Sequence, residues 1–127
     1  MKKTTYNITR TYDLKPKADL RHADLTYLII PFVDLKDADL GDANIKHTLG
    51  QHGDFRGAKF HGADLRHALM MDADFRGAIF KDADLRDICF LNADLRDANL
   101  DGADLMGASF IAPNGDVYKI GRGKIGK

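Results

Sequence analysis

The 127-residue chain contains no glutamate, so its 19 acidic residues are all aspartates. It also has no tryptophan, only three prolines and a single cysteine, Cys89. One cysteine cannot form a disulfide within the chain, which is typical of a reducing compartment. Aspartate bonds to nearby backbone groups and tolerates tight bends, whereas longer acidic side chains favour helices. An acidic set made of aspartate alone therefore predicts a chain built of turns.

The sequence also lacks a hydrophobic run long enough to span a membrane. Its first residues include two lysines but no apolar segment of the kind found in secretion signals, so we expect a cytoplasmic protein. The formal net charge is zero, yet it is unevenly distributed. Residues 18–112 carry a net charge of −7, whereas residues 1–17 carry +4 and residues 113–127 carry +3.

A five-residue repeat occupies most of the chain. Nineteen consecutive blocks run from Ala18 to Ala112 without an insertion or deletion. Every fifth residue from Leu20 to Phe110 is Leu, Ile, Met or Phe, except Gly50. A small residue, usually Ala, stands two places earlier, and Asp or Asn usually lies between the two. A period of five fits neither a helix nor an ordinary strand, so the repeat predicts a solenoid.

The blocks ADLRH at 18–22 and 63–67 and ADLRD at 83–87 and 93–97 carry a family resemblance. Their A(D/N)LxX unit resembles the repeat of the pentapeptide-repeat proteins. The resemblance implies an all-β fold, a right-handed quadrilateral β-helix in which four pentapeptides form one coil of 20 residues. It also implies that the central residue and the small residue two before it point inward. We expect about five coils over residues 18–112.

The two ends of such a solenoid expose unpaired backbone and need covering. Residues 1–17 are predicted to be an N-terminal capping segment, because Tyr6, Ile8, Tyr12 and Leu14 alternate with polar residues as in a strand. Residues 113–127 are predicted to be a hairpin-like tail, since Asn114-Gly115 is a hairpin signal. Inside the repeat, Gly50 occupies a large inward position, for which we expect a local bulge or a slip that turns Leu49 inward.

Outward residues whose numbers differ by 20 are expected to lie above one another. The face centred on Leu35 and Leu95 then carries an acidic column beside a basic one: Asp34, Asp54, Asp74 and Asp94, with Lys36, Arg56, Arg76 and Arg96. Like charges stacked at about 4.8 Å repel, so a neighbouring column of opposite sign favours self-neutralising charge ladders. The alternative, arginine columns that grip phosphates, is weaker because each arginine has an aspartate beside it.

One face departs from this polar pattern. Most of its outward residues and one corner are apolar: Ile29, Pro31, Phe32, Leu49, Leu69, Met71, Cys89, Leu91 and Ile111. A monomer keeps such patches small, so the pattern predicts that a second subunit, another partner or the C-terminal tail covers this face.

The histidines first suggest a metal site, because Tyr27, His47, His67 and Asp87 share one column. A flat column does not offer three or four convergent ligands, so stacked rings are the better interpretation. No nucleophile with a base and no phosphate-binding loop is visible, and a filled barrel leaves no pocket. We therefore expect a non-enzyme without catalytic residues, metal, cofactor or small-molecule substrate.

Three functions remain open. The first is a rigid, non-catalytic scaffold that uses its apolar face to dimerise or to dock a protein partner. The second follows from the family resemblance, since the family includes quinolone-resistance proteins that imitate DNA and bind type II topoisomerases such as DNA gyrase. A charge of −7 over four faces is a poor imitation of DNA, which carries one charge per roughly 1.7 Å. The third is nucleic-acid binding through the basic tails, with direct binding by the barrel not expected.

Overall fold

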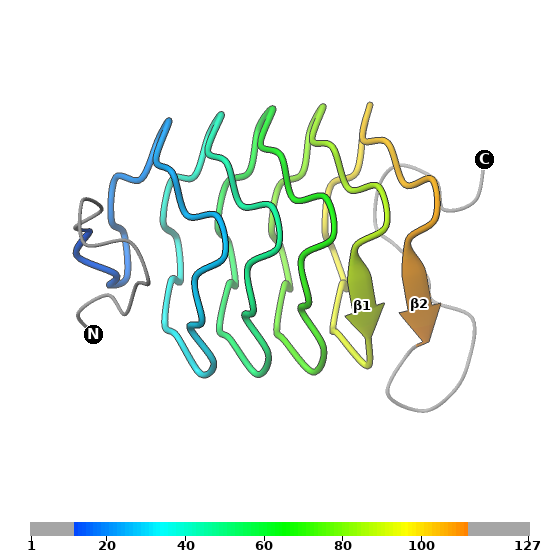
Figure 1. The fold of residues 1–127 in the computed structure, drawn as a ribbon, viewed down its shortest axis with the longest axis horizontal. Coiled ribbons are helices and arrows are strands. Elements are labelled where there is room, and N and C mark those ends of the chain that lie inside the picture. Colours follow the sequence, from blue (N-terminus) through cyan, green and yellow to red (C-terminus); the bar gives the residue numbers. More distant parts are fainter. Residues whose placement is uncertain (1–11, 112–127) are drawn as a thin grey trace.

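The structure, a computed structural model, describes residues 12–111, which wind into a stack of coils along one axis (Figure 1). Parallel bridges join residues 20 apart along the stack, from Asp19–Asp39 to Asp84–Asp104. Near the C-terminal end two of these bridged segments are long enough to be strands, β1 (Cys89–Leu91) and β2 (Ser109–Ile111), which pair in parallel. One coil therefore takes 20 residues, and the predicted four-sided, all-β helix is confirmed.

Each corner of a coil is a tight turn closed by a backbone hydrogen bond. At one such corner, Ala23 N–H donates to the Leu20 carbonyl at 3.1 Å, and His22 between them has a φ of 61°. A positive φ at the third residue is characteristic of a type II turn. Five corner residues are glycines, but most of the others are Asp, Asn or His, which tolerate this conformation best among side-chain-bearing residues.

The aspartates of the repeat close these turns a second time. Asp54 Oδ1 accepts the Arg56 backbone N–H at 3.2 Å, and Asp39 Oδ1 accepts that of Gly41 at 3.0 Å. The same bond recurs around the coils: the backbone N–H of the residue directly after the central one donates to the Asp or Asn side chain directly before the central one. A short Asp or Asn side chain has the length for this ring. The requirement explains why the acidic residues directly before the central positions are aspartates.

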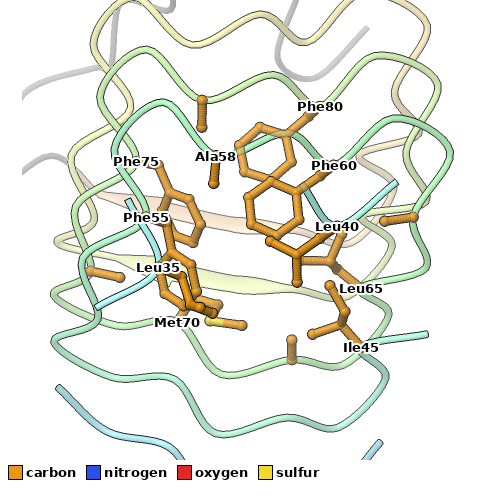
Figure 2. Close-up of a cluster of buried hydrophobic side chains, with 14 of the residues drawn as sticks. Leu35, Leu40, Ile45, Phe55, Ala58, Phe60, Leu65, Met70, Phe75 and Phe80 are labelled. Atoms are coloured by element: carbon orange, nitrogen blue, oxygen red, sulfur yellow. The ribbon is translucent and has the colours of Figure 1, made fainter. Parts of the chain in front are cut away.

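The interior is filled by stacked large residues and by the buried alanines of the repeat (Figure 2). Phe55 stacks on Phe75 with ring centroids 4.8 Å apart, and Phe60 stacks on Phe80 at 4.9 Å. Phe90 meets the edge of this cluster, 5.3 Å from Phe75. Offset and edge-to-face aromatic contacts add to the free energy gained by burial alone. The four walls are thus held apart by one continuous apolar core.

The expectation of a bulge or slip at Gly50 is wrong. Leu49 keeps its regular bridges to Ile29 and Leu69 and remains half-exposed, while Gly50 N–H donates to the Leu69 carbonyl at 2.9 Å. The space that a large side chain would take is already occupied. A Cβ added at Gly50 would lie 2.6 Å from Met70 Sδ and 3.3 Å from Phe55 Cζ. Larger neighbours, rather than a change in the backbone, compensate for the glycine.

The first described residues close the N-terminal end of the core. Leu14 is fully buried, and the Tyr12 hydroxyl accepts the Asp24 backbone N–H at 2.9 Å. The other predicted capping residues, Tyr6 and Ile8, and the predicted tail 113–127 lie outside the described residues. In the last described coil, the inward residues Leu105 and Phe110 are only half-buried.

Candidate functional site

We call the wall centred on Ile30, Gly50, Met70, Phe90 and Phe110 the apolar face. The structure places all nine residues predicted for this surface at outward or corner positions, and none of them is buried. Phe32 is 72% exposed, Ile111 51% and Leu69 36%. The remaining six are half-buried: Ile29, Pro31, Leu49, Met71, Cys89 and Leu91. These side chains form a continuous stripe along the coil axis, because each column advances by 20 residues per coil.

A shallow groove runs along one edge of the apolar face. It is lined by one column of rings and one column of aliphatic side chains: Tyr27, His47 and His67, with Ile29, Leu49 and Leu69. The Tyr27 and His47 rings stack at 4.7 Å, and the His47 and His67 rings stack at 5.0 Å. The stacked rings expected from the sequence are therefore present, and the groove beside them is an additional feature.

A second stacked pair lines the opposite edge of the apolar face. The Phe32 and His52 rings lie 4.8 Å apart and are nearly parallel. This pair was missed by the sequence analysis, although Phe32 and His52 differ by 20 and the column rule would have found it. Phe32 and Tyr27 both have a φ near +60°, which is unusual for bulky residues. Two exposed aromatic rings thus occupy corners that would suit smaller residues better.

A carboxylate follows the histidines on both edges. His67 Nε2 lies 3.8 Å from Asp87 Oδ2, and His52 Nε2 lies 3.7 Å from Asp72 Oδ2. Each contact is an ion pair only when the imidazole is protonated. Within residues 12–111, no group of three or more His, Cys, Asp or Glu side chains could hold a metal ion. The histidine columns therefore act as edges of the apolar face, with polar ring atoms directed along it.

The neighbouring charged face is organised differently. Arg56 Nη2 lies 2.7 Å from Asp54 Oδ2 in its own coil, and Arg56 Nε lies 3.7 Å from Asp74 Oδ2 in the next. Arg76 repeats this arrangement with Asp74 and Asp94, and Lys36 with Asp34 and Asp54. Arg96 Nη2 lies 2.6 Å from Asp94 Oδ2. The opposite face carries a similar ladder through Arg66 and Arg86.

These contacts change the proton affinities of the carboxyl groups. The side-chain hydrogen bond from Arg56 lowers the pKa of Asp54, and that from Lys36 lowers the pKa of Asp34. At the N-terminal end, the Arg21 side-chain hydrogen bond lowers the pKa of Asp19 to about 2. The aspartates consequently stay ionised at neutral pH and compete with any external anion for the arginines. This geometry favours a self-neutralised surface over a phosphate-binding one.

Among the described residues, no helix has the length and apolar character needed to cross a membrane.

Cys89 carries a free thiol and is half-buried on the apolar face.

The family model described as pentapeptide repeats matches residues 54–90 and 88–111, with eight repeat copies. Among solved structures, HetL from the cyanobacterium Nostoc sp. strain PCC 7120 is similar, with 27% sequence identity and a TM-score of 0.74. HetL is a pentapeptide repeat protein involved in the regulation of heterocyst differentiation. The match covers 81% of this chain and 50% of HetL, so the chain spans about half the length of that protein.

Two further solved structures share the fold. Rfr23, a pentapeptide repeat protein from the cyanobacterium Cyanothece 51142, is 22% identical with a TM-score of 0.55, over 84% of this chain and 67% of its own. QnrB1, a plasmid-mediated fluoroquinolone resistance protein, is 24% identical with a TM-score of 0.60, over 73% of this chain and 47% of its own. No curated protein sequence matches the chain. Its unbroken five-residue repeat, its 20-residue coils and these similarities together show that the chain has the repeat and the fold of the pentapeptide-repeat proteins.

Proposed function

We propose that the chain is a rigid, non-catalytic scaffold for protein–protein interaction that docks a protein on its apolar face. The observation that carries this proposal is the concentration of outward apolar side chains on one wall, whereas the other described walls carry only isolated ones such as Ile79 and Met106. No charged residue occupies the ten outward positions of this wall: Ile29, Pro31, Leu49, Gln51, Leu69, Met71, Cys89, Leu91, Ser109 and Ile111. The other three walls carry charged side chains in their outward columns. Contiguous apolar surface of this kind marks interaction sites on proteins.

The corner residues of the apolar face support the same proposal. Tyr27 and Phe32 hold positive φ angles of 61° and 62°, yet both rings are exposed and add little to the core. Bulky residues in this backbone region cost free energy, and such strain is concentrated at functional sites. A role in contacting another molecule accounts for aromatic rings at positions where glycine or aspartate would fit with less strain.

The second candidate, a DNA mimic that modulates DNA gyrase or another DNA-binding protein, is supported less well. Mimicry requires a regular array of uncompensated negative charge. On the two ladder faces, however, Arg56, Arg76, Arg66 and Arg86 each lie between two aspartates. The third candidate, nucleic-acid binding by the basic tails, concerns Lys119, Arg122, Lys124 and Lys127, which lie outside the described residues.

The proposal is tested by comparing protein capture by three immobilised forms of the chain. These are the wild type, the double variant Leu69→Asp/Leu91→Asp, and the control Ile79→Asp/Met106→Asp. The control places the same charges on outward apolar residues of two of the other three walls. We expect the wild type and the control to retain the same protein, whether a host protein or free chain, and the double variant to lose it. Equal retention by all three forms would mean that the apolar face is not the docking site.

A further inference from the structure

We infer that the partner that fits the apolar face is a second copy of this chain, packed with its coil axis along that of the first. This inference rests on the proposed docking function and names the occupant. Ring centroids along both edges of the face are separated by 4.7, 5.0 and 4.8 Å, which is the spacing of stacked coils. The backbone positions that carry the outward side chains of this face therefore recur once per coil.

A partner that fits one step of this surface must fit the following steps as well. The α-helix advances about 5.4 Å per turn, and it loses about 3 Å of register over five coils. In an extended strand, side chains on the same side are roughly 6.6 Å apart, which differs still more from the coil spacing. A second copy has the same axial repeat, so its outward columns stay in register along the whole face. Such a self-complementary contact is the usual way in which a chain forms a twofold dimer.

The distribution of charge also favours the apolar face as the contact between two copies. Residues 18–112 carry a net charge of −7, so two copies repel when their acidic surfaces approach. The outward columns of the apolar face are uncharged, which removes this repulsion from the centre of the contact. Each of its two edge columns carries one aspartate next to a histidine, since His52 lies beside Asp72 and His67 beside Asp87. Two copies can therefore meet along this wall without opposing unbroken columns of like charge.

The size of the face predicts a weak dimer. Four coil spacings of about 4.8 Å give a stripe on the order of 20 Å long. With a width of roughly 10 Å, the stripe supplies a few hundred Å², less than the roughly 800 Å² per partner of a standard interface. The edge rings of Tyr27, Phe32 and His52 enlarge the contact. We therefore expect reversible association with a dissociation constant in roughly the micromolar range.

The decisive experiment is charge complementation at Leu69, measured by sedimentation velocity and light scattering on the full chain from about 1 to 500 μM. The wild type and the matched control Ile79→Asp are expected to form dimers with similar affinity. Leu69→Asp and Leu69→Arg should each weaken dimerisation by about 30-fold or more, because each places like charges in the contact. An equimolar mixture of the two variants should recover the dimer, since opposite charges then meet across the same surface.

Circular dichroism spectra of the variants establish that each remains folded, and Leu91→Asp provides a second site on the same face. A wild type that stays monomeric over the whole range would overturn the inference. If the capture experiment then still depends on Leu69 and Leu91, the scaffold function stands with a different partner. A monomer whose melting temperature falls on Leu69→Asp would place residues 112–127 of the same chain on the face instead. A dimer that is unaffected by either charge would use another surface and would also overturn the inference.

Discussion

The charged face centred on Leu35, Phe55, Phe75 and Leu95 and the apolar face beside it are built on the same coils but differ inside and outside. The charged face has a regular interior of leucine and phenylalanine and an exterior of paired aspartates and cations. The apolar face has an irregular interior, with Gly50 followed by Met70 and Phe90, and an uncharged exterior. Corner turns and coil-to-coil hydrogen bonds are alike on both. The residue types in the outward columns can therefore differ from wall to wall while the backbone of the coil stays the same.

The largest effect is expected inside the charged face. Phe75→Ala removes a ring that stacks on Phe55 and also contacts Phe80 and Phe90. Loss of a fully buried aromatic side chain leaves a cavity and should lower the free energy of unfolding by about 3–5 kcal/mol. Urea denaturation followed by circular dichroism measures this change. Phe110→Ala, in the half-buried end of the core, is the matched control and should cost clearly less. An equal loss in the free energy of unfolding for the two variants would show that side chains in the middle of the core are not packed more closely than those at its end.

Inside the apolar face, an apparent repair should be harmful. Gly50→Leu restores the large residue of the repeat, but the space belongs to Met70 and Phe55. Overpacking should lower the free energy of unfolding by about 1–3 kcal/mol in the same urea assay. The double variant Gly50→Leu/Met70→Ala frees part of that space, so its destabilisation should be smaller than the sum of the two single changes. Additive effects would mean that Met70 does not compensate for the glycine.

The smallest effect concerns the exterior of the charged face. Asp54→Asn keeps the side-chain acceptor for Arg56 N–H and loses the ion pair, whereas Asp54→Glu keeps the charge but loses the short ring. A surface ion pair contributes about 0–1 kcal/mol and a hydrogen bond about 1 kcal/mol. We expect Asp54→Glu to be the more destabilising of the two in thermal and urea unfolding. If Asp54→Asn is the more destabilising, the aspartate column of the charged face stabilises the fold mainly through ion pairs rather than through turn formation.

The same variants have a defined pH dependence. Because the Arg56 hydrogen bond lowers the pKa of Asp54 in the folded chain, its stabilisation is present above the ordinary carboxyl pKa of about 3.9. It is lost as the pH falls through the lowered folded pKa. Asp54→Asn, which cannot titrate, should therefore lose less stability than the wild type between neutral pH and about pH 2.

The sequence contained enough information for the fold because the repeat marks inward and outward positions directly. Leu20 and its equivalents, the alanines before them and the turn-closing aspartates could all be assigned from one five-residue pattern. Gly50 could not, because its environment depends on Met70, one coil later, and on Phe55 at the next wall. The groove beside Leu49 likewise depends on how the rings of Tyr27 and His47 lie. The use of the apolar face, the nature of the two chain ends and a cytoplasmic location stay predictions.

The 20-residue coil has a consequence for how such a chain can lengthen. Duplication of 20 residues adds one level to all four walls and leaves each surface continuous, because bridged residues still differ by 20. Duplication of a single pentapeptide keeps the same alternation of inward and outward positions, yet it turns every later residue by a quarter of a revolution. The apolar stripe would then be cut in two and its halves would face perpendicular directions. Insertions that are equivalent for folding can thus differ completely for recognition.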